Sequence, residues 1–115
     1  MSKLSRMQQF QNKTFPDDKG QPKQGHEYRT LNNVYGYEEI GILLRWRDGR
    51  LHDDGDHPAV EFQDAHVEHY RNGLLHMDQT DMEGNLKPAI IADYGTKFEF
   101  YLNGRQVDPE VMNAQ

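Results

Sequence analysis

Cysteine is absent from the 115 residues, and serine occurs only as Ser2 and Ser5. Without cysteine the chain has no disulfide, no thiolate zinc site, no iron–sulfur cluster and no cysteine nucleophile. The sequence also lacks a nucleophile elbow, a P-loop and a dinucleotide glycine fingerprint, so a serine hydrolase is close to excluded. No apolar run approaches the roughly 18 residues of a membrane-spanning helix.

The composition is acidic, because nineteen Asp and Glu residues face thirteen Lys and Arg residues and give a formal net charge of −6. Nucleic acids and anionic membranes select basic surfaces, so this balance argues against direct binding to either. The first 14 residues contain no apolar segment typical of a secretory signal peptide. We therefore expect a cytoplasmic protein, and the length predicts a single domain.

Hydrophobic residues make up only 35% of the chain. Residues 1–30 are rich in Gln, Lys and Gly, and we interpret them as a polar N-terminal arm that is partly helical or flexible. Leu4, Met7 and Phe10 recur at helical spacing, which predicts one short helix in this arm. Residues 31–115 are expected to form one antiparallel β domain. Its predicted core consists of Ile40, Ile42, Leu43, Leu44, Trp46, Val60, Phe62, Ile90, Ile91, Phe98, Phe100 and Leu102.

A pattern repeats from Trp46 onward. An aromatic residue stands two places before an Asp-Gly or Asn-Gly pair in residues 46–49, 70–73 and 101–104. Such pairs are a strong signal for a two-residue hairpin turn, because a type I′ turn needs positive φ at both central residues. The pattern predicts a mainly β protein, an antiparallel β-meander of hairpin repeats at 46–69, 70–100 and 101–107.

Two stretches alternate with the period of a half-buried strand. Val60 and Phe62 are expected on the buried face. Within residues 97–102 we expect Phe98, Phe100 and Leu102 to point inward, whereas Glu99 and Tyr101 point outward. Asp108-Pro109-Glu110 has the signature of a helix start, which predicts a short C-terminal helical turn.

The repeats resemble the MORN-like repeats that carry a G-x-L-H … P-A pattern. The matching residues are Gly49, Leu51, His52, Pro58 and Ala59 in the first unit, and Gly73, Leu75, His76, Pro88 and Ala89 in the second. Asp53 stands where a basic residue commonly follows the histidine, and the third unit stops after Gly104. The resemblance implies a β-meander and no fixed chemistry.

The histidines raise the possibility of a metal site, and we expect none. His66 and His69 are an odd number of residues apart, so on a regular strand they point to opposite faces. His52 and His76 occupy equivalent positions in the repeats, which favours a structural role beside each turn. A metal-dependent hydrolase that uses His66, Glu68 and their neighbours is kept as a minor alternative, but we expect no enzyme activity and no cofactor.

The negative charge is concentrated in residues 53–83, which carry nine acidic residues and one basic residue, Arg71. On a rigid sheet, interleaved carboxylates can match the charge density of duplex DNA. The candidate partner-binding residues are Asp53, Asp54, Asp56, Glu61, Asp64, Glu68, Asp78, Asp81 and Glu83, with Tyr70 and Tyr101 as further aromatic contacts.

In size, acidity and charge clustering the chain resembles the small bacterial DNA-mimic proteins that bind the histone-like nucleoid protein HU. This resemblance implies an inhibitor that occupies the DNA-binding surface of a basic, HU-like protein. The alternative from the residues themselves is a repeat-type β scaffold or oligomerisation domain, whose sheet edges pair with another copy. We expect a monomer under the first hypothesis and a dimer under the second.

Overall fold

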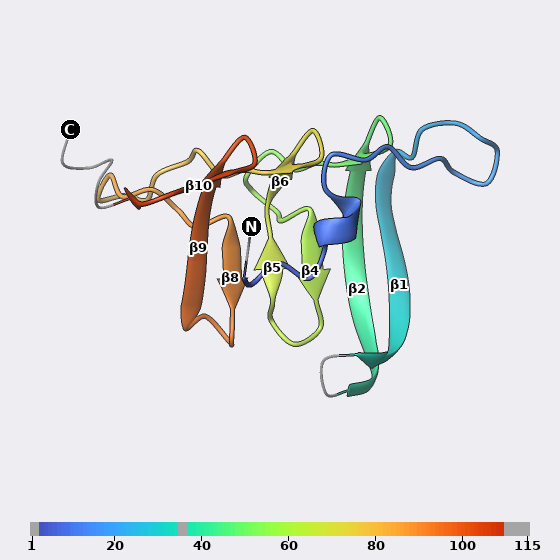
Figure 1. Ribbon diagram of the computed structural model, residues 1–115, viewed down its shortest axis with the longest axis horizontal. Coiled ribbons are helices and arrows are strands. Elements are labelled where there is room, and N and C mark those ends of the chain that lie inside the picture. Colours follow the sequence, from blue (N-terminus) through green and yellow to red (C-terminus); the bar gives the residue numbers. More distant parts are fainter. Residues whose placement is uncertain (1–2, 35–36, 110–115) are drawn as a thin grey trace.

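The computed structural model describes residues 3–34 and 37–109. In Figure 1 the main strands stand side by side, and the N-terminal residues cross in front of them. The elements in chain order are the 3₁₀ helix η1 (Gln8–Phe10) and the strands β1 (Gly25–Val34), β2 (Tyr37–Arg47), β3 (Arg50–Leu51), β4 (Val60–Phe62), β5 (Val67–Glu68), β6 (Tyr70–Arg71), β7 (Leu74–Leu75), β8 (Ile90–Ala92), β9 (Lys97–Leu102) and β10 (Arg105–Val107).

Eight strands form one antiparallel sheet in the order β1-β2-β4-β5-β8-β9-β10, with β3 paired to β2 outside this path. The strands β6 and β7 form a separate two-stranded hairpin. Neighbours along the sheet are largely neighbours in sequence, as a meander requires. The prediction of a mainly β, antiparallel meander is therefore confirmed.

The three Asp-Gly and Asn-Gly pairs lie at hairpin turns. Asp48, Asn72 and Asn103 have φ angles of 52°, 51° and 50°, and the glycine after each also has positive φ. These angles match a type I′ turn, in which both central residues are left-handed. Each pair joins short antiparallel strands, which are β2 and β3, β6 and β7, and β9 and β10.

The three hairpins stack on one another along one edge of the molecule, at the top of Figure 1. The Gly73 amide donates a hydrogen bond to the Leu51 carbonyl at 2.8 Å, and the Gly104 amide donates to the Leu75 carbonyl at the same distance. Each turn therefore rests on the strand that follows the preceding turn. This contact couples units that are separated by more than twenty residues.

The N-terminal segment comprises residues 3–24. Residues 3–15 lie against the sheet, whereas residues 16–22 form a loop that extends beyond β1 (Figure 1). The short helix of this segment differs from the prediction. Within the described residues, the only helix that both begins and ends is the three-residue 3₁₀ helix η1. The amides of Lys3 and Arg6 donate to carboxylates of the sheet, Glu99 at 3.2 Å and Glu68 at 2.8 Å. These amides bond to the sheet and not to a helical turn, which explains why the helical spacing from Leu4 does not produce an α-helix. Residues 25–30, which the arm prediction included, belong to β1.

The predicted orientation of residues 97–102 is wrong. Glu99 and Tyr101 are buried, whereas Phe98 is 48% exposed and Phe100 and Leu102 are only partly buried. The cost of burying the Glu99 carboxylate is offset by hydrogen bonds. The Tyr101 hydroxyl donates to it at 3.1 Å, and the Lys3 amide is a second donor.

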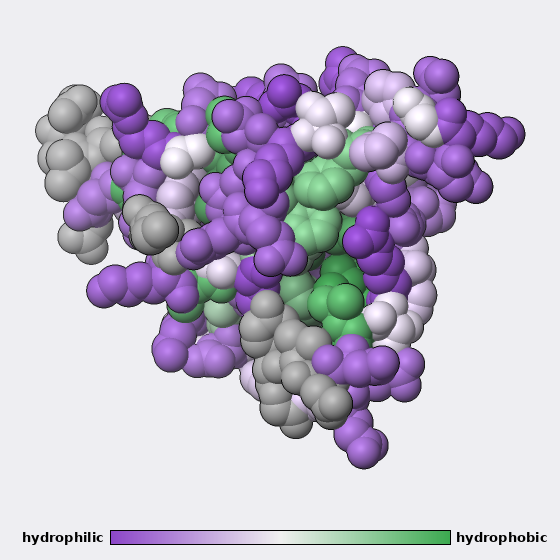
Figure 2. All heavy atoms as spheres, turned by 45° about the vertical axis from the view of Figure 1, so that its right-hand side comes forward, coloured by the Kyte–Doolittle hydropathy of each residue, from purple (hydrophilic) through white to green (hydrophobic). Residues whose placement is uncertain are grey.

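The core is built mainly on one face of the sheet. Ile40, Ile42, Leu44, Trp46, Val60, Phe62 and Ile90 are buried as predicted. The sequence-based core omitted Met7, Leu51, Tyr70, Leu75, Met77 and Tyr101, which are buried as well. Phe10, Phe15, Leu4 and Leu31 pack against it while partly exposed, and Figure 2 shows a band of apolar atoms between polar rims on the face turned forward.

Residues 110–115 lie outside the described part of the chain, and with them lies most of the predicted C-terminal helical turn. Within the described residues, no helix has the length and apolar character to cross a membrane.

Candidate functional site

The nine candidate acidic residues do not share one surface. Asp53 and Glu68 are buried in separate networks. Glu61, Asp64 and Asp78 each form an ion pair with an arginine. The other four, Asp54, Asp56, Asp81 and Glu83, are exposed in loops. The candidate set thus divides into structural carboxylates and surface carboxylates.

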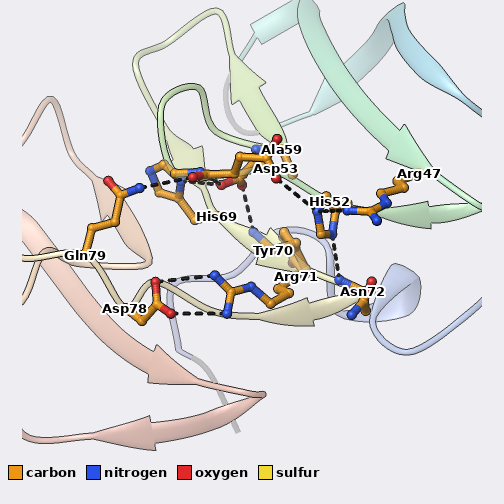
Figure 3. A network of polar contacts seen from close by, with 12 residues as sticks. Arg47, His52, Asp53, Ala59, His69, Tyr70, Arg71, Asn72, Asp78 and Gln79 are labelled. Atoms are coloured by element: carbon orange, nitrogen blue, oxygen red, sulfur yellow. Dashed lines mark hydrogen bonds and ion pairs between the residues drawn. The ribbon is translucent and has the colours of Figure 1, made fainter.

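Asp53 joins the first repeat to the second (Figure 3). One carboxylate oxygen accepts hydrogen bonds from the amides of Ala59 at 2.7 Å and Tyr70 at 2.9 Å. The other accepts from the Gly55 amide at 2.9 Å and from Nδ1 of His69 at 3.1 Å. Four donors leave this buried carboxylate no capacity for a partner protein, and the bonds fix the start of β4 to the start of β6.

Glu68 lies at the centre of a second buried network. Its Oε1 accepts from the hydroxyls of Ser5 at 2.8 Å and Tyr70 at 2.7 Å. Its Oε2 accepts from the Arg6 amide at 2.8 Å and from Nε2 of His66 at 2.7 Å. Burial, followed by the charge of Glu68, raises the pKa of the Tyr70 hydroxyl well above its usual range. Tyr70 and Tyr101, the two aromatic contact candidates, are both core residues.

Three carboxylates of the set are held by arginines. Arg6 binds Asp64 at 2.9 Å, Arg45 binds Glu61, and Arg71 binds Asp78 at 3.1 Å. Partial desolvation acts to raise the pKa of Asp64, but the hydrogen bond from Arg6 outweighs it, and the pKa is lowered. The pKa of Asp78 is likewise lowered against desolvation, by His76 and Arg71. These pairs reduce the negative charge that the set presents to solvent.

The exposed carboxylates gather in two loops that touch each other. We define the acidic loop edge as residues 53–57 and 78–84, which include neither Lys nor Arg. The Gln79 side chain donates to the Asp54 carbonyl at 3.0 Å (Figure 3). Asp54 and Asp78 also line one small hollow. The exposed acids of this edge are Asp54, Asp56, Asp78, Asp81 and Glu83.

Asp81 has a local role in addition to its charge. Its Oδ1 accepts hydrogen bonds from the amides of Glu83 and Asn85, both at 2.9 Å. This arrangement shapes the loop, so Asp81 cannot be replaced without altering the loop itself. By contrast, the side chain of Asp54 is 87% exposed.

A cleft of about 410 Å³ adjoins the acidic loop edge. Its lining includes Asp53, Asp54, Asp56 and His57 of that edge, together with Arg45, Arg47, His26 and His52. Mixed charge of this kind favours no single ligand class. Within residues 3–34 and 37–109, no three His, Asp or Glu side chains converge to hold a metal ion.

His52 and His76, which occupy equivalent positions in the repeats, each bind the turn of the following unit. Nδ1 of His52 accepts from the Asn72 amide at 3.1 Å, and Nδ1 of His76 accepts from the Asn103 amide at 2.9 Å. The equivalence of these residues in the sequence thus reflects equivalent hydrogen bonds in the structure.

The remaining histidines occupy separate environments. His66 contacts Glu68, whereas His69 contacts Asp53. The two residues named for a metal-dependent hydrolase, His66 and Glu68, lie together in the interior. Both are almost completely buried.

A carboxylate that sequence reasoning missed, Glu27, stands beside Trp46. It accepts from Lys23 Nζ at 2.7 Å, Arg29 Nε at 3.0 Å and Trp46 Nε1 at 3.0 Å. The hydrogen bond from Arg29, with that from Lys23 and both positive charges, lowers its pKa from 4.5 to about 2 despite some desolvation. The sequence offered only its spacing from Lys23 and Arg29 as a signal.

We expect a carboxyl NMR titration to give Glu27 a midpoint near 2. Because the folded pKa is depressed, the carboxylate contributes to stability above pH 4.5, and this contribution is lost as the pH falls from 4.5 towards 2. Replacing Arg29 by glutamine should move the midpoint upward towards 4.5. A midpoint in the folded wild type that already lies at the ordinary value would contradict this assignment.

No protein-family model matches this chain, and comparisons with curated proteins and with solved structures found no match either.

Proposed function

We propose that this protein is an acidic, non-enzymatic protein-binding module that occupies the DNA-binding surface of a basic, HU-like protein. The observation that carries the proposal is the acidic loop edge. It holds five exposed carboxylates in two touching loops that contain neither Lys nor Arg, and one of the five, Asp78, is paired with Arg71 from outside the loops. This surface is smaller than the nine-residue surface expected from the sequence, since Asp53 and Glu68 are buried.

Electrostatics supports this partner class. A surface of one sign raises the association rate of an oppositely charged protein, in the same way that DNA attracts it. Because exposed charges are screened by salt, the affinity should fall as the ionic strength rises. Buried Asp53 fixes the first loop through the amides of Ala59 and Tyr70, and Asp81 holds the second through the amides of Glu83 and Asn85, so both loops have a defined shape.

A repeat-type β scaffold is the second candidate function. It is favoured by the stacked hairpins, in which each turn glycine bonds to the preceding unit. The resemblance to MORN-like repeats stays a proposal that these contacts support, because it predicts equivalent positions for Gly73 and Gly104.

The decisive variant neutralises the exposed acids that hold no loop together, as Asp54→Asn, Asp56→Asn and Glu83→Gln combined. With exposed ion pairs worth about 0.5 kcal/mol each, binding to purified HU-like protein should weaken roughly tenfold at low salt. Wild-type binding should also fall with added salt and with competitor duplex DNA. Isothermal titration calorimetry at two salt concentrations measures both effects.

The matched control makes the same charge change elsewhere, as Asp18→Asn, Glu38→Gln and Glu39→Gln, which are also exposed. At about 0.1 M salt this control should bind within about twofold of the wild type, since charges beyond the Debye length of about 10 Å are then largely screened. Equal loss in the two triple variants would indicate a non-specific charge effect. Absence of any HU binding at low salt would overturn the proposed function.

A further inference from the structure

A continuous row of side chains runs across the sheet face that lies opposite to the N-terminal segment. Residues that pair across neighbouring strands place one member of each strand in this row. In order from β1 to β9 they are Tyr28, Leu43, Glu61, Val67, Ile91 and Phe98. Five of the six are apolar or aromatic.

Strand alternation assigns the row to that face. Glu68 and Glu99 contact the N-terminal segment, so their side chains point to the covered face. Val67 and Phe98 are their chain neighbours and therefore point to the opposite face. Phe98 is 48% exposed and Tyr28 is 68% exposed, whereas Leu43, Val67 and Ile91 are partly buried.

An antiparallel sheet with one solvated face normally has polar residues at such positions. Here these positions are occupied by apolar residues instead, namely Leu43, Val67, Ile91 and Phe98. Phe100 lies on the same face, two residues beyond Phe98. An apolar sheet face is stable when a second layer covers it. The N-terminal segment supplies that layer for the other face, through contacts such as Arg6 with Glu68.

The charge of the row indicates which class of partner fits it. Its one charged member, Glu61, is paired with Arg45, so the row is electrically neutral. A basic protein or a nucleic acid gains nothing from a neutral surface, whereas two copies of the chain bring no net charge of one sign together along this row. The net charge of −6 resides elsewhere, including the acidic loop edge.

The face is also large enough. Six strands about 4.8 Å apart make the row about 24 Å wide. The sheet lies in the plane of the two longer dimensions of the molecule, 48 and 32 Å (Figure 1). A specific interface buries about 800 Å² on each partner. The long strands β1, β2 and β9 would supply most of this area, because β4, β5 and β8 have only two or three residues each.

We propose that this face is a homodimer interface, in which the sheets of two copies pack face to face about a two-fold axis. Such packing places two sheets about 10 Å apart with their strands about 30° from parallel. Tyr28 and Phe98, at the two ends of the row, supply the aromatic area that such interfaces favour. A dimer differs from the monomer that the sequence led us to expect for a DNA mimic. Its interface uses other residues than the acidic loop edge, so either proposal can fail without the other.

Sedimentation equilibrium tests the proposal on the full chain. The wild type is expected at twice 13.5 kDa, with no loss of dimer in high salt, because apolar contacts are not screened. Ile91→Lys should give a monomer. The triple variant Val67→Thr, Ile91→Thr and Phe98→Thr keeps β-favouring residues at exposed or partly buried positions, and it should be monomeric with an unchanged far-UV spectrum.

Met82→Lys is the matched control, because Met82 is a fully exposed apolar residue in the acidic loop edge. It should leave the dimer intact. Since the chain has no cysteine, Ile91→Cys gives a unique site for a short thiol cross-linker, and covalent dimer is expected there and not with Met82→Cys.

A wild type that stays monomeric at its highest soluble concentration would overturn the proposal. A dimer that survives both Ile91→Lys and the triple threonine change would overturn it as well, since the copies would then be joined by their strand edges. Binding of the HU-like protein should be the same for Ile91→Lys and the wild type. A monomeric Ile91→Lys variant supports the proposal whether or not HU binds.

Discussion

Replacing Glu68 by alanine is expected to lower the free energy of unfolding by about 3–5 kcal/mol, because four buried hydrogen bonds to a charged acceptor are lost and each is worth roughly 1.5–3 kcal/mol before the structure relaxes. The change removes the acceptor of four hydrogen bonds, which come from the hydroxyls of Ser5 and Tyr70, the Arg6 amide and Nε2 of His66. A domain of this length has a total stability of about 5–15 kcal/mol, so the loss is a large fraction of it. Urea denaturation followed by tryptophan fluorescence measures the change.

The same substitution should release the N-terminal segment. Arg6 donates its amide to Glu68, so amide exchange at Arg6 should become faster in the variant. Glu83→Ala is the control, because Glu83 is exposed and its removal should change stability by less than about 0.5 kcal/mol. Equal stabilities for the two alanine variants would refute a structural role for Glu68.

The turns were predictable because their chemistry is local. Asp48, Asn72 and Asn103 each precede a glycine, and a two-residue turn with positive φ needs little beyond these residue types. The alternation of Val60 and Phe62 was equally local. These features suffice for the number and order of the hairpins, and hence for the meander.

The orientation of β9 could not be predicted from alternation. Phe98 and Phe100 on one face compete with Tyr101 on the other, and hydrophobicity alone favours the phenylalanines. The structure buries Glu99 and Tyr101, because the Lys3 amide, distant in the sequence, helps to satisfy the carboxylate. A strand with aromatic residues on both faces has no unique inward side until a partner is known.

The candidate binding set was overestimated for a related reason. A count of charges records where acids lie in the sequence and not which donors they meet. Glu68 and Glu99 each precede a tyrosine by two residues and accept from its hydroxyl. That repeated Glu-x-Tyr spacing was a signal of structural carboxylates.

Two loops share a second repeated pattern that the sequence-based prediction did not use. Residues 17–23 and 81–87 share the pattern Asp-x-x-Gly-x-x-Lys. In each loop the Asp carboxylate accepts from the amides two and four residues later. This similarity identifies Asp81 as a residue that shapes its loop, and it could have been found before the structure.

Asp53→Ala is expected to destabilise the protein by about 3 kcal/mol, because hydrogen bonds to a buried charged group are worth roughly 1.5–3 kcal/mol and three amides and one imidazole would lose their acceptor. The adjacent acid provides the matched control, since Asp54 has an exposed side chain and Asp54→Ala should change stability by less than about 0.5 kcal/mol. Urea denaturation of both variants measures this difference.

Asp53 links Ala59 to Tyr70, so its loss should also speed amide exchange at both positions, whereas Asp54→Ala should leave them protected. A stable Asp53→Ala variant that binds its partner poorly would instead make Asp53 a contact residue, as the sequence first suggested.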